Sequence, residues 1–237
     1  AIVNHPDINK IAFTGSTDVG KIIQRAVSGT NKKVTLELGG KAANIIFDDA
    51  PIDQAVEGVI NGIFFNQGHV CCAGSRLFVQ ESVYDIILRK LKDRLSTLIV
   101  GDPMDKNTDI GAINSKQQMD NIHKYLRIGE KEGLEIYQNN CVLPKKGFFI
   151  RPTLFTNVAQ SSRLAQEEIF GPVLTIYVYP DAEWSQTLKL VDETSAYALT
   201  GAIFAQDSYA MEEAKTALVN SAGNLYLNDK STGAVVG

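Results

Sequence analysis

The sequence lacks the features of several protein classes. Its 237 residues contain only three cysteines, of which Cys71 and Cys72 are adjacent, so a disulfide framework is not expected. This usage favours a reducing compartment, the cytoplasm or the mitochondrial matrix. The formal net charge of −4 leaves no basic surplus for neutralising a phosphate backbone, so nucleic acid is not expected as a partner. The apolar runs are too short to cross a bilayer, and no membrane span is predicted.

Both ends of the chain also lack terminal signals. The first residues, Ala-Ile-Val-Asn-His-Pro, contain no charged region followed by an apolar core and a cleavage site, so no signal peptide is predicted. Residues 231–237 are small and mostly apolar and carry neither a helix stop nor a polar tail. We therefore expect the sequence to be a fragment of a longer chain.

The composition is that of an ordinary globular protein, 44% hydrophobic and 21% charged, and helix patterns alternate with strand patterns. The expected strands are residues 10–14, 33–38, 76–80, 134–137, 173–179, 200–205 and 224–227, and residues 44–47 begin a further element. The expected helices are residues 17–27, 53–65, 83–98, 116–132, 184–193 and 209–220. This order predicts an α/β fold, in which a mostly parallel sheet has helices on both faces.

The turn Leu38-Gly39-Gly40 is the expected domain boundary. Its two glycines break the strand over residues 33–38 and change the direction of the chain. We expect a short first piece over residues 1–38 and a larger, self-sufficient piece over residues 39–237.

One candidate for chemistry is Cys71, in the segment Phe-Phe-Asn-Gln-Gly-His-Val-Cys-Cys-Ala-Gly-Ser-Arg over residues 64–76. The cysteine follows a glycine-bearing loop at the end of a predicted helix, where a thiol is open to attack a substrate. The alternative is a small buried hydrophobic residue, the commoner role of a cysteine in a soluble domain.

A second candidate is Glu37, in Thr-Leu-Glu-Leu-Gly-Gly-Lys over residues 35–41. Two glycines follow it and let the backbone and a ligand approach closely, so the carboxylate is placed to act as a general base for water. The alternative is a solvated ion pair with Lys33 or Lys41.

Two further segments have the residue types of a nucleotide site. Phe-Thr-Gly-Ser, ending at Gly15 and Ser16, precedes a predicted helix, whose N-terminus can bind phosphate, although it is not a GxGxxG motif. Glu-Glu-Ile-Phe-Gly-Pro-Val, which includes Glu168 and Phe170, offers carboxylates for ribose hydroxyls. The alternatives are an ordinary turn for the first segment and a charged turn before a strand for the second.

Together and in this order, the four segments resemble the aldehyde dehydrogenase superfamily. The resemblance implies an aldehyde dehydrogenase-like catalytic domain over residues 39–237, incomplete at its C-terminus. Residues 1–38 would be the C-terminal piece of a Rossmann-type NAD-binding domain. It also implies an aldehyde substrate, NAD as cofactor with NADP as the alternative, no metal, and a homo-oligomer of the full-length protein.

The same resemblance assigns the catalytic residues. Cys71 matches the nucleophile, because it lies three residues after Gly68 of Asn-Gln-Gly, and Glu37 matches the base that activates the deacylating water. The implied reaction oxidises an aldehyde to a carboxylate through a cysteine thioester. One departure is His69, where the family usually carries glutamine.

The resemblance also assigns the cofactor-binding residues. Glu168 and Phe170 match the pair that holds the nicotinamide ribose and ring. Gly15 and Ser16 match the turn near the pyrophosphate.

The substrate signal is divided along the chain. Residues 177–237 resemble glutamate-semialdehyde (pyrroline-carboxylate) dehydrogenases, which implies oxidation of glutamate semialdehyde to glutamate in proline catabolism. The segments around Glu37 and Cys71 resemble the general aldehyde dehydrogenases instead. Two other functions stay open: a non-catalytic structural or interaction protein that keeps the fold, and a thiol esterase that uses the same cysteine without a cofactor.

Overall fold

The chain folds into two compact units, Ala1–Gly39 and Gly40–Gly237, in a computed structural model that describes residues 1–232. The division falls between Gly39 and Gly40, within the glycine turn. The last part of the larger expected domain, residues 233–237, lies outside the described residues.

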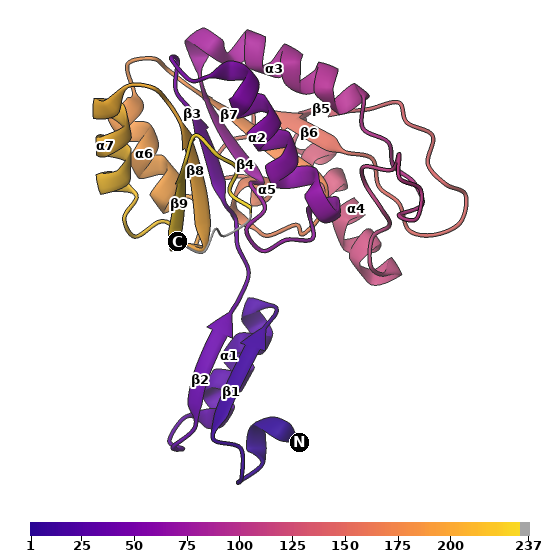
Figure 1. Ribbon diagram of the computed structural model, residues 1–237, viewed down its shortest axis with the longest axis vertical. Coiled ribbons are helices and arrows are strands. Elements are labelled where there is room, and N and C mark those ends of the chain that lie inside the picture. Colours follow the sequence, from indigo (N-terminus) through magenta and orange to yellow (C-terminus); the bar gives the residue numbers. More distant parts are fainter. Residues whose placement is uncertain (233–237) are drawn as a thin grey trace. The chain divides into compact units, whose positions relative to one another are not determined.

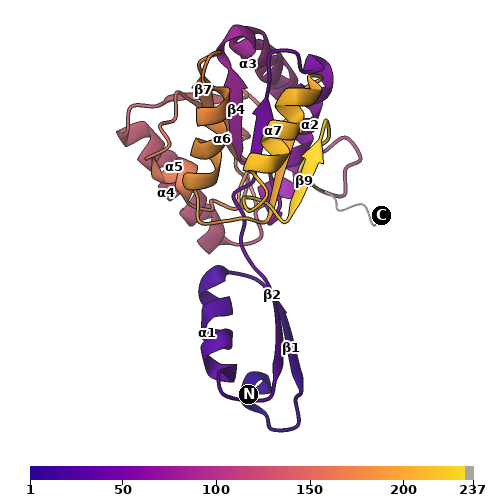
Figure 2. The same ribbon diagram turned by 90° about the vertical axis from the view of Figure 1, so that its left-hand side faces the viewer.

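The first unit is a strand-helix-strand motif (Figure 2). Its elements are the short helix η1 (Ile2–Asn4), strand β1 (Lys10–Thr14), helix α1 (Thr17–Val27) and strand β2 (Lys33–Glu37). The two strands are parallel, as the crossover helix between them requires. Ile11 from β1 and Ile23 and Val27 from α1 form the small core of this unit.

The second unit contains a seven-stranded sheet in the order β5-β6-β7-β4-β3-β8-β9 (Figure 1). The strands are β3 (Ala43–Ile46), β4 (Arg76–Gln80), β5 (Glu135–Gln138), β6 (Thr153–Thr156), β7 (Val173–Tyr179), β8 (Thr200–Phe204) and β9 (Asn224–Leu227). The β5–β6 pair is antiparallel and every other pair is parallel. The predicted mostly parallel sheet is confirmed.

Helices cover both faces of this sheet (Figure 1). They are α2 (Ile52–Phe64), α3 (Glu81–Ser96), α4 (Lys116–Lys131), the short α5 (Arg163–Gln166), α6 (Trp184–Glu193) and α7 (Ser208–Ala217). Successive residues of a strand point to opposite faces, and on β4 Leu77 packs with α2 and α3 whereas Phe78 packs with α6 and α7. The predicted helices on both faces are therefore confirmed.

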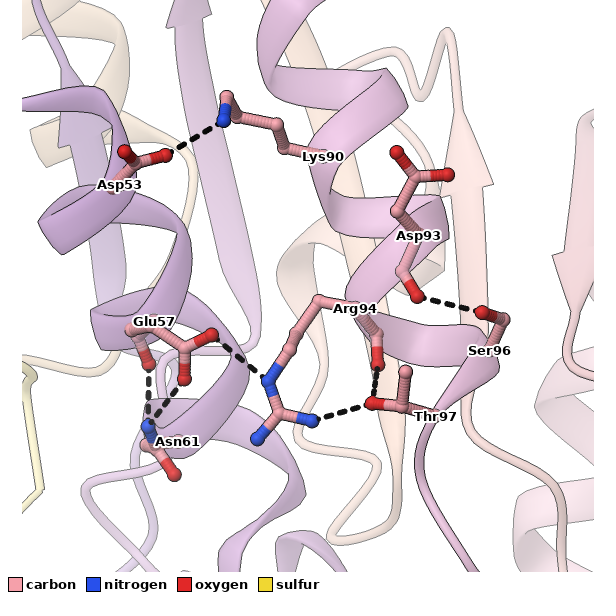
Figure 3. A network of polar contacts seen from close by, with 8 residues as sticks. All are labelled: Asp53, Glu57, Asn61, Lys90, Asp93, Arg94, Ser96 and Thr97. Atoms are coloured by element: carbon pink, nitrogen blue, oxygen red, sulfur yellow. Dashed lines mark hydrogen bonds and ion pairs between the residues drawn. The ribbon is translucent and has the colours of Figure 1, made fainter.

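Helices α2 and α3 are also joined by polar contacts on their exposed side (Figure 3). Lys90 Nζ lies 2.7 Å from Asp53 Oδ1, and Arg94 Nε lies 2.8 Å from Glu57 Oε1. Such half-exposed pairs contribute about 0.2–1 kcal/mol each. The fully buried Leu91 of α3 contributes more, since truncation of a core leucine costs roughly 2–5 kcal/mol. Apolar burial therefore fixes this helix pair.

Three short elements differ from the sequence expectations. Strand β6 and helix α5 have four residues each and were not predicted, although the equally short β5 and β9 were. The helix expected over residues 209–220 begins at Ser208, where the Asp207 side chain accepts the Tyr209 N–H, and it ends at Ala217.

Over residues 1–232, no helix has the length and apolarity that a membrane crossing requires.

Candidate active site

The loop that carries Cys71 begins with an unusual backbone. Helix α2 ends at Phe64, and η2 (Phe65–Gly68) follows with three successive residues in the left-handed region. Their φ angles are 49° at Asn66, 57° at Gln67 and 74° at Gly68. A non-glycine residue in this region costs on the order of 1–3 kcal/mol and persists only where the surroundings impose it. Such strain is typical of a functional loop.

Two glycines hold the loop at distances that no side chain would permit. A Cβ on Gly68 would lie 2.2 Å from the carbonyl oxygen of Gly171, and a Cβ on Gly40 would lie 2.0 Å from that of Cys71. Both distances are far below van der Waals contact. The Cys71 backbone is thus packed directly against Gly40, and the preceding turn is packed against the segment over residues 167–173.

Hydrogen bonds fix the remainder of the loop, residues 66–75. The Cys72 carbonyl accepts from Ser231 Oγ at 2.9 Å and from Thr200 Oγ1 at 3.3 Å. The buried Asn44 donates from Nδ2 to the Gly74 carbonyl at 2.9 Å. These donors come from β3, from the start of β8 and from the segment after β9, so three separate segments hold the loop that carries Cys71.

The Cys71 thiol is half-buried and is not part of a disulfide. Burial raises its pKa, the neighbouring Cys72 adds to this, and the backbone N–H groups of both cysteines act against it. These N–H groups therefore lie near enough to the sulfur to favour its ionised form. The thiol is therefore mostly protonated at neutral pH and needs a base before it attacks.

Glu168 lies in the same unit and is held by the glycine turn. Its Oε1 accepts the Gly40 N–H at 3.0 Å, and burial raises its pKa against the effects of this bond and of Lys41. Its second oxygen has no hydrogen-bond donor among residues 1–232. That oxygen is free to accept a hydroxyl group.

The neighbouring Glu167 is engaged differently. Arg163 donates to it twice, at 2.6 and 2.8 Å, and Tyr125 donates once, at 2.7 Å. The Arg163 bonds are the main reason that the pKa of Glu167 falls to about 2. Of the two glutamates, only Glu168 is left for a ligand.

Phe170 stands in a tight turn beside Glu168. Its φ is 55°, and Gln118 of α4 donates to the carbonyls of Ile169 and Phe170, both at 2.9 Å. The structure thus brings together Cys71, Glu168 and Phe170 within the second unit.

The other expected site residues lie in the first unit. Ser16 caps α1, with its Oγ accepting the Val19 N–H at 3.4 Å. The Gly15 N–H donates to the Glu37 carbonyl at 3.0 Å, so the end of β2 is tied to the turn before α1. The Glu37 side chain is exposed at this end of the strand.

Sequence reasoning missed one residue of the site, Lys41. It is only 2% exposed, and its Nζ has no hydrogen-bond partner in the described part of the chain. Burial lowers its pKa to about 7, Arg76 adds to this, and Glu168 and Glu167 oppose it. The apolar residues that follow Lys41 are the only signal of this burial in the sequence.

Known proteins resemble this chain along its whole length. The model of the aldehyde dehydrogenase family matches residues 1–237. The chain belongs to the aldehyde dehydrogenase family. An aldehyde dehydrogenase of Davidiella tassiana is 43% identical over 233 residues, which are 98% of this chain and 46% of that protein. Retinal dehydrogenase 2 of Homo sapiens is 43% identical over 235 residues, covering 96% of this chain and 43% of that protein.

Solved structures of aldehyde dehydrogenases share the fold. The NAD⁺ complex of an aldehyde dehydrogenase from Bacillus cereus superimposes with a TM-score of 0.90 at 36% identity. That match covers 98% of this chain and 46% of the other. The chain therefore spans about half the length of the aldehyde dehydrogenases that it matches.

The close approach at Gly68 predicts a specific effect of substitution. Gly68→Ala adds a methyl group against the Gly171 carbonyl, whereas Gly133→Ala, at a φ of 72°, meets no atom within 4 Å. Both variants bear the cost of a left-handed alanine, about 1–2 kcal/mol. Only Gly68→Ala should lose a further ~1–3 kcal/mol in urea unfolding and change the alkylation rate of Cys71. Equal losses in the two variants would contradict the packing described here.

The buried Lys41 predicts how stability depends on pH. Its pKa is about 7 in the folded state and 10.5 ordinarily, so the folded state binds fewer protons between these values. The free energy of unfolding should then rise by up to about 1.4 kcal/mol per pH unit from pH 7 to 10. Urea titrations of Lys41→Met should show a smaller slope, and those of the exposed control Lys116→Met should keep it. A slope unchanged in Lys41→Met would contradict the burial of a titrating amine.

Proposed function

We propose that the full-length protein carrying this sequence is an NAD(P)-dependent aldehyde dehydrogenase with Cys71 as its nucleophile. The observation that carries this proposal is the loop of Cys71, which a strained backbone and two close glycine contacts hold in place. A cysteine that served only as packing would not require three left-handed residues before it. Membership in the family supports the same function.

Each proposed catalytic residue has a separate role in the reaction. Cys71 gives up its thiol proton to a water molecule, attacks the carbonyl carbon with its sulfur and then holds the acyl group as a thioester. The N–H groups of Cys71 and Cys72 stabilise the negative oxygen that forms in each addition. Glu37 takes a proton from water, which attacks the thioester, breaks the carbon–sulfur bond and releases a carboxylate and a thiol.

The proposed cofactor is NAD, with NADP as the alternative. When bound, the nicotinamide supplies the acceptor for the hydride that leaves the substrate carbon. Glu168 fits the nicotinamide ribose, since one of its oxygens is fixed by Gly40 and the other lacks a donor among the described residues. Phe170 would contact the nicotinamide ring. Gly15 and Ser16, at the N-terminus of the 11-residue α1, would lie near the pyrophosphate.

We also propose a substrate, an assembly and a compartment for the full-length protein. The resemblance of residues 177–237 favours glutamate semialdehyde, and hence a role in proline catabolism. The segments around Glu37 and Cys71 favour a more general aldehyde. We propose a homo-oligomer, by analogy with the family, and a reducing compartment, the cytoplasm or the mitochondrial matrix.

The test is a spectrophotometric assay of cofactor reduction by the full-length protein. Glutamate semialdehyde and aliphatic aldehydes should be compared with NAD and with NADP. Cys71→Ser should lose activity on the order of a thousandfold or more, whereas Cys72→Ser, its matched control, should keep most of it.

Other outcomes of this assay distinguish the remaining functions. Hydrolysis of activated esters by Cys71 with no aldehyde oxidation would indicate a thiol esterase. Absence of both reactions, together with no cofactor binding, would leave a structural or interaction role and would refute the proposed enzyme.

A further inference from the structure

His69 contacts two segments outside its own loop. Its ring packs on the ring of Phe170, with centroids 5.3 Å apart and planes inclined by 30°. Its Nε2 accepts the backbone N–H of Asn114 at 3.4 Å. Because His69 lies two residues before Cys71, it links the loop over residues 66–75 with both the Phe170 turn and the segment before α4.

The hydrogen bond from the Asn114 N–H to His69 Nε2 forms only when the His69 ring is neutral. An imidazole nitrogen accepts a hydrogen bond only when it carries no proton, so Nε2 must be free and the ring neutral. Burial lowers the pKa of His69, and hydrogen bonds with the Gln67 backbone and the Asn114 side chain oppose this. On protonation, two N–H donors would face each other at Nε2, and the bond would be lost.

No charged group stabilises the imidazolium from the packed segments. On the Asn114 side, the next charged residue is Lys116, which pairs with Asp120 at 2.6 Å. On the Phe170 side, Glu168 is bonded to the Gly40 N–H. Within the described residues, His69 forms no ion pair. The one titratable neighbour on its own loop is the Cys71–Cys72 pair.

The Phe170 turn is held firmly on its other side. Gln118 donates to the carbonyls of Ile169 and Phe170 at 2.9 Å, and Asn114 is joined to α4 through Ser115 at the helix start. A change at His69 therefore alters the Cys71 loop relative to a fixed Phe170, rather than moving the turn itself.

We propose that His69 is a positioning residue that couples the Cys71 loop to the Phe170 turn, and that protonation of its ring releases the coupling. The inference rests on the proposed function, in which Phe170 contacts the nicotinamide and Cys71 attacks the aldehyde. Aldehyde oxidation by this protein then weakens at acid pH for a reason separate from ionisation of the thiol.

The first experiment measures the titration of His69 and Asn114 by NMR and needs no catalytic activity. In full-length protein with isotope-labelled histidine and asparagine, the His69 ring should titrate below pH 6.5, and the Asn114 backbone amide should shift with the same midpoint. The His69 signal is identified as the one that is absent in His69→Gln, and the Asn114 signal as the one that is absent in Asn114→Gln. A ring that titrates at or above pH 6.5, as contact with an aromatic face alone would favour, would overturn the proposal.

The second experiment uses His69→Gln, whose side chain accepts a hydrogen bond but does not titrate. In the unsubstituted protein with NADH bound, the alkylation rate of Cys71, corrected for thiol ionisation, should change about threefold to tenfold as pH drops through the His69 midpoint, the effect of losing one hydrogen bond. His69→Gln should show no such change, and an equal change in both proteins would refute the coupling.

A failure of the proposed function would be recognisable separately. If NADH does not bind at any pH, the proposed function fails, and the same alkylation rate is then measured in the protein without cofactor. A step at the His69 midpoint that is absent in His69→Gln would support the coupling, and the lack of a step would refute it.

Discussion

The site depends on the close packing of backbone against backbone around the Cys71 loop. Gly40 touches the carbonyl of Cys71, and Gly68 touches that of Gly171. These contacts bring Cys71, Gly40 and the Phe170 turn together, although they lie far apart in the sequence. All three segments lie just before a strand, β3, β4 or β7, and these strands are parallel, so the segments meet at the amino ends of the strands. Ligands of such sheets more often bind at the opposite, carboxyl ends.

Buried charge is the second constraint on this site. Lys41 and Arg76 are both nearly inaccessible, and within residues 1–232 Arg76 forms no ion pair with a carboxylate: it donates instead to the carbonyls of Lys41 and Val191. Of the two glutamates whose charges favour the protonated Lys41, Glu168 has the larger effect, and Glu167 is already paired with Arg163. A buried ammonium without a hydrogen-bonded partner destabilises a fold, so its presence beside Glu168 indicates a contribution to function rather than to stability.

The sequence predicted the long elements well but missed two of the four-residue ones, β6 and α5. Helices such as α3 and α4 show a clear period over 16 residues each, whereas β6 has only four residues and gains its strand character from pairing with β7. For the site, motifs indicated Cys71, Glu168 and Phe170, but the neighbours of Lys41 and His69 come from distant segments. Contacts of that kind depend on tertiary packing, which no local pattern encodes.

The claim that Cys71 is the nucleophile is tested most directly by trapping its acyl intermediate. In the full-length Glu37→Gln variant, loss of the base should slow hydrolysis of the thioester more than its formation. After incubation with aldehyde and NAD and an acid quench, peptide mass spectrometry should then find the acyl group on Cys71. An acyl group on Cys72, or a Cys71 that stays unmodified while cofactor is reduced, would contradict the account.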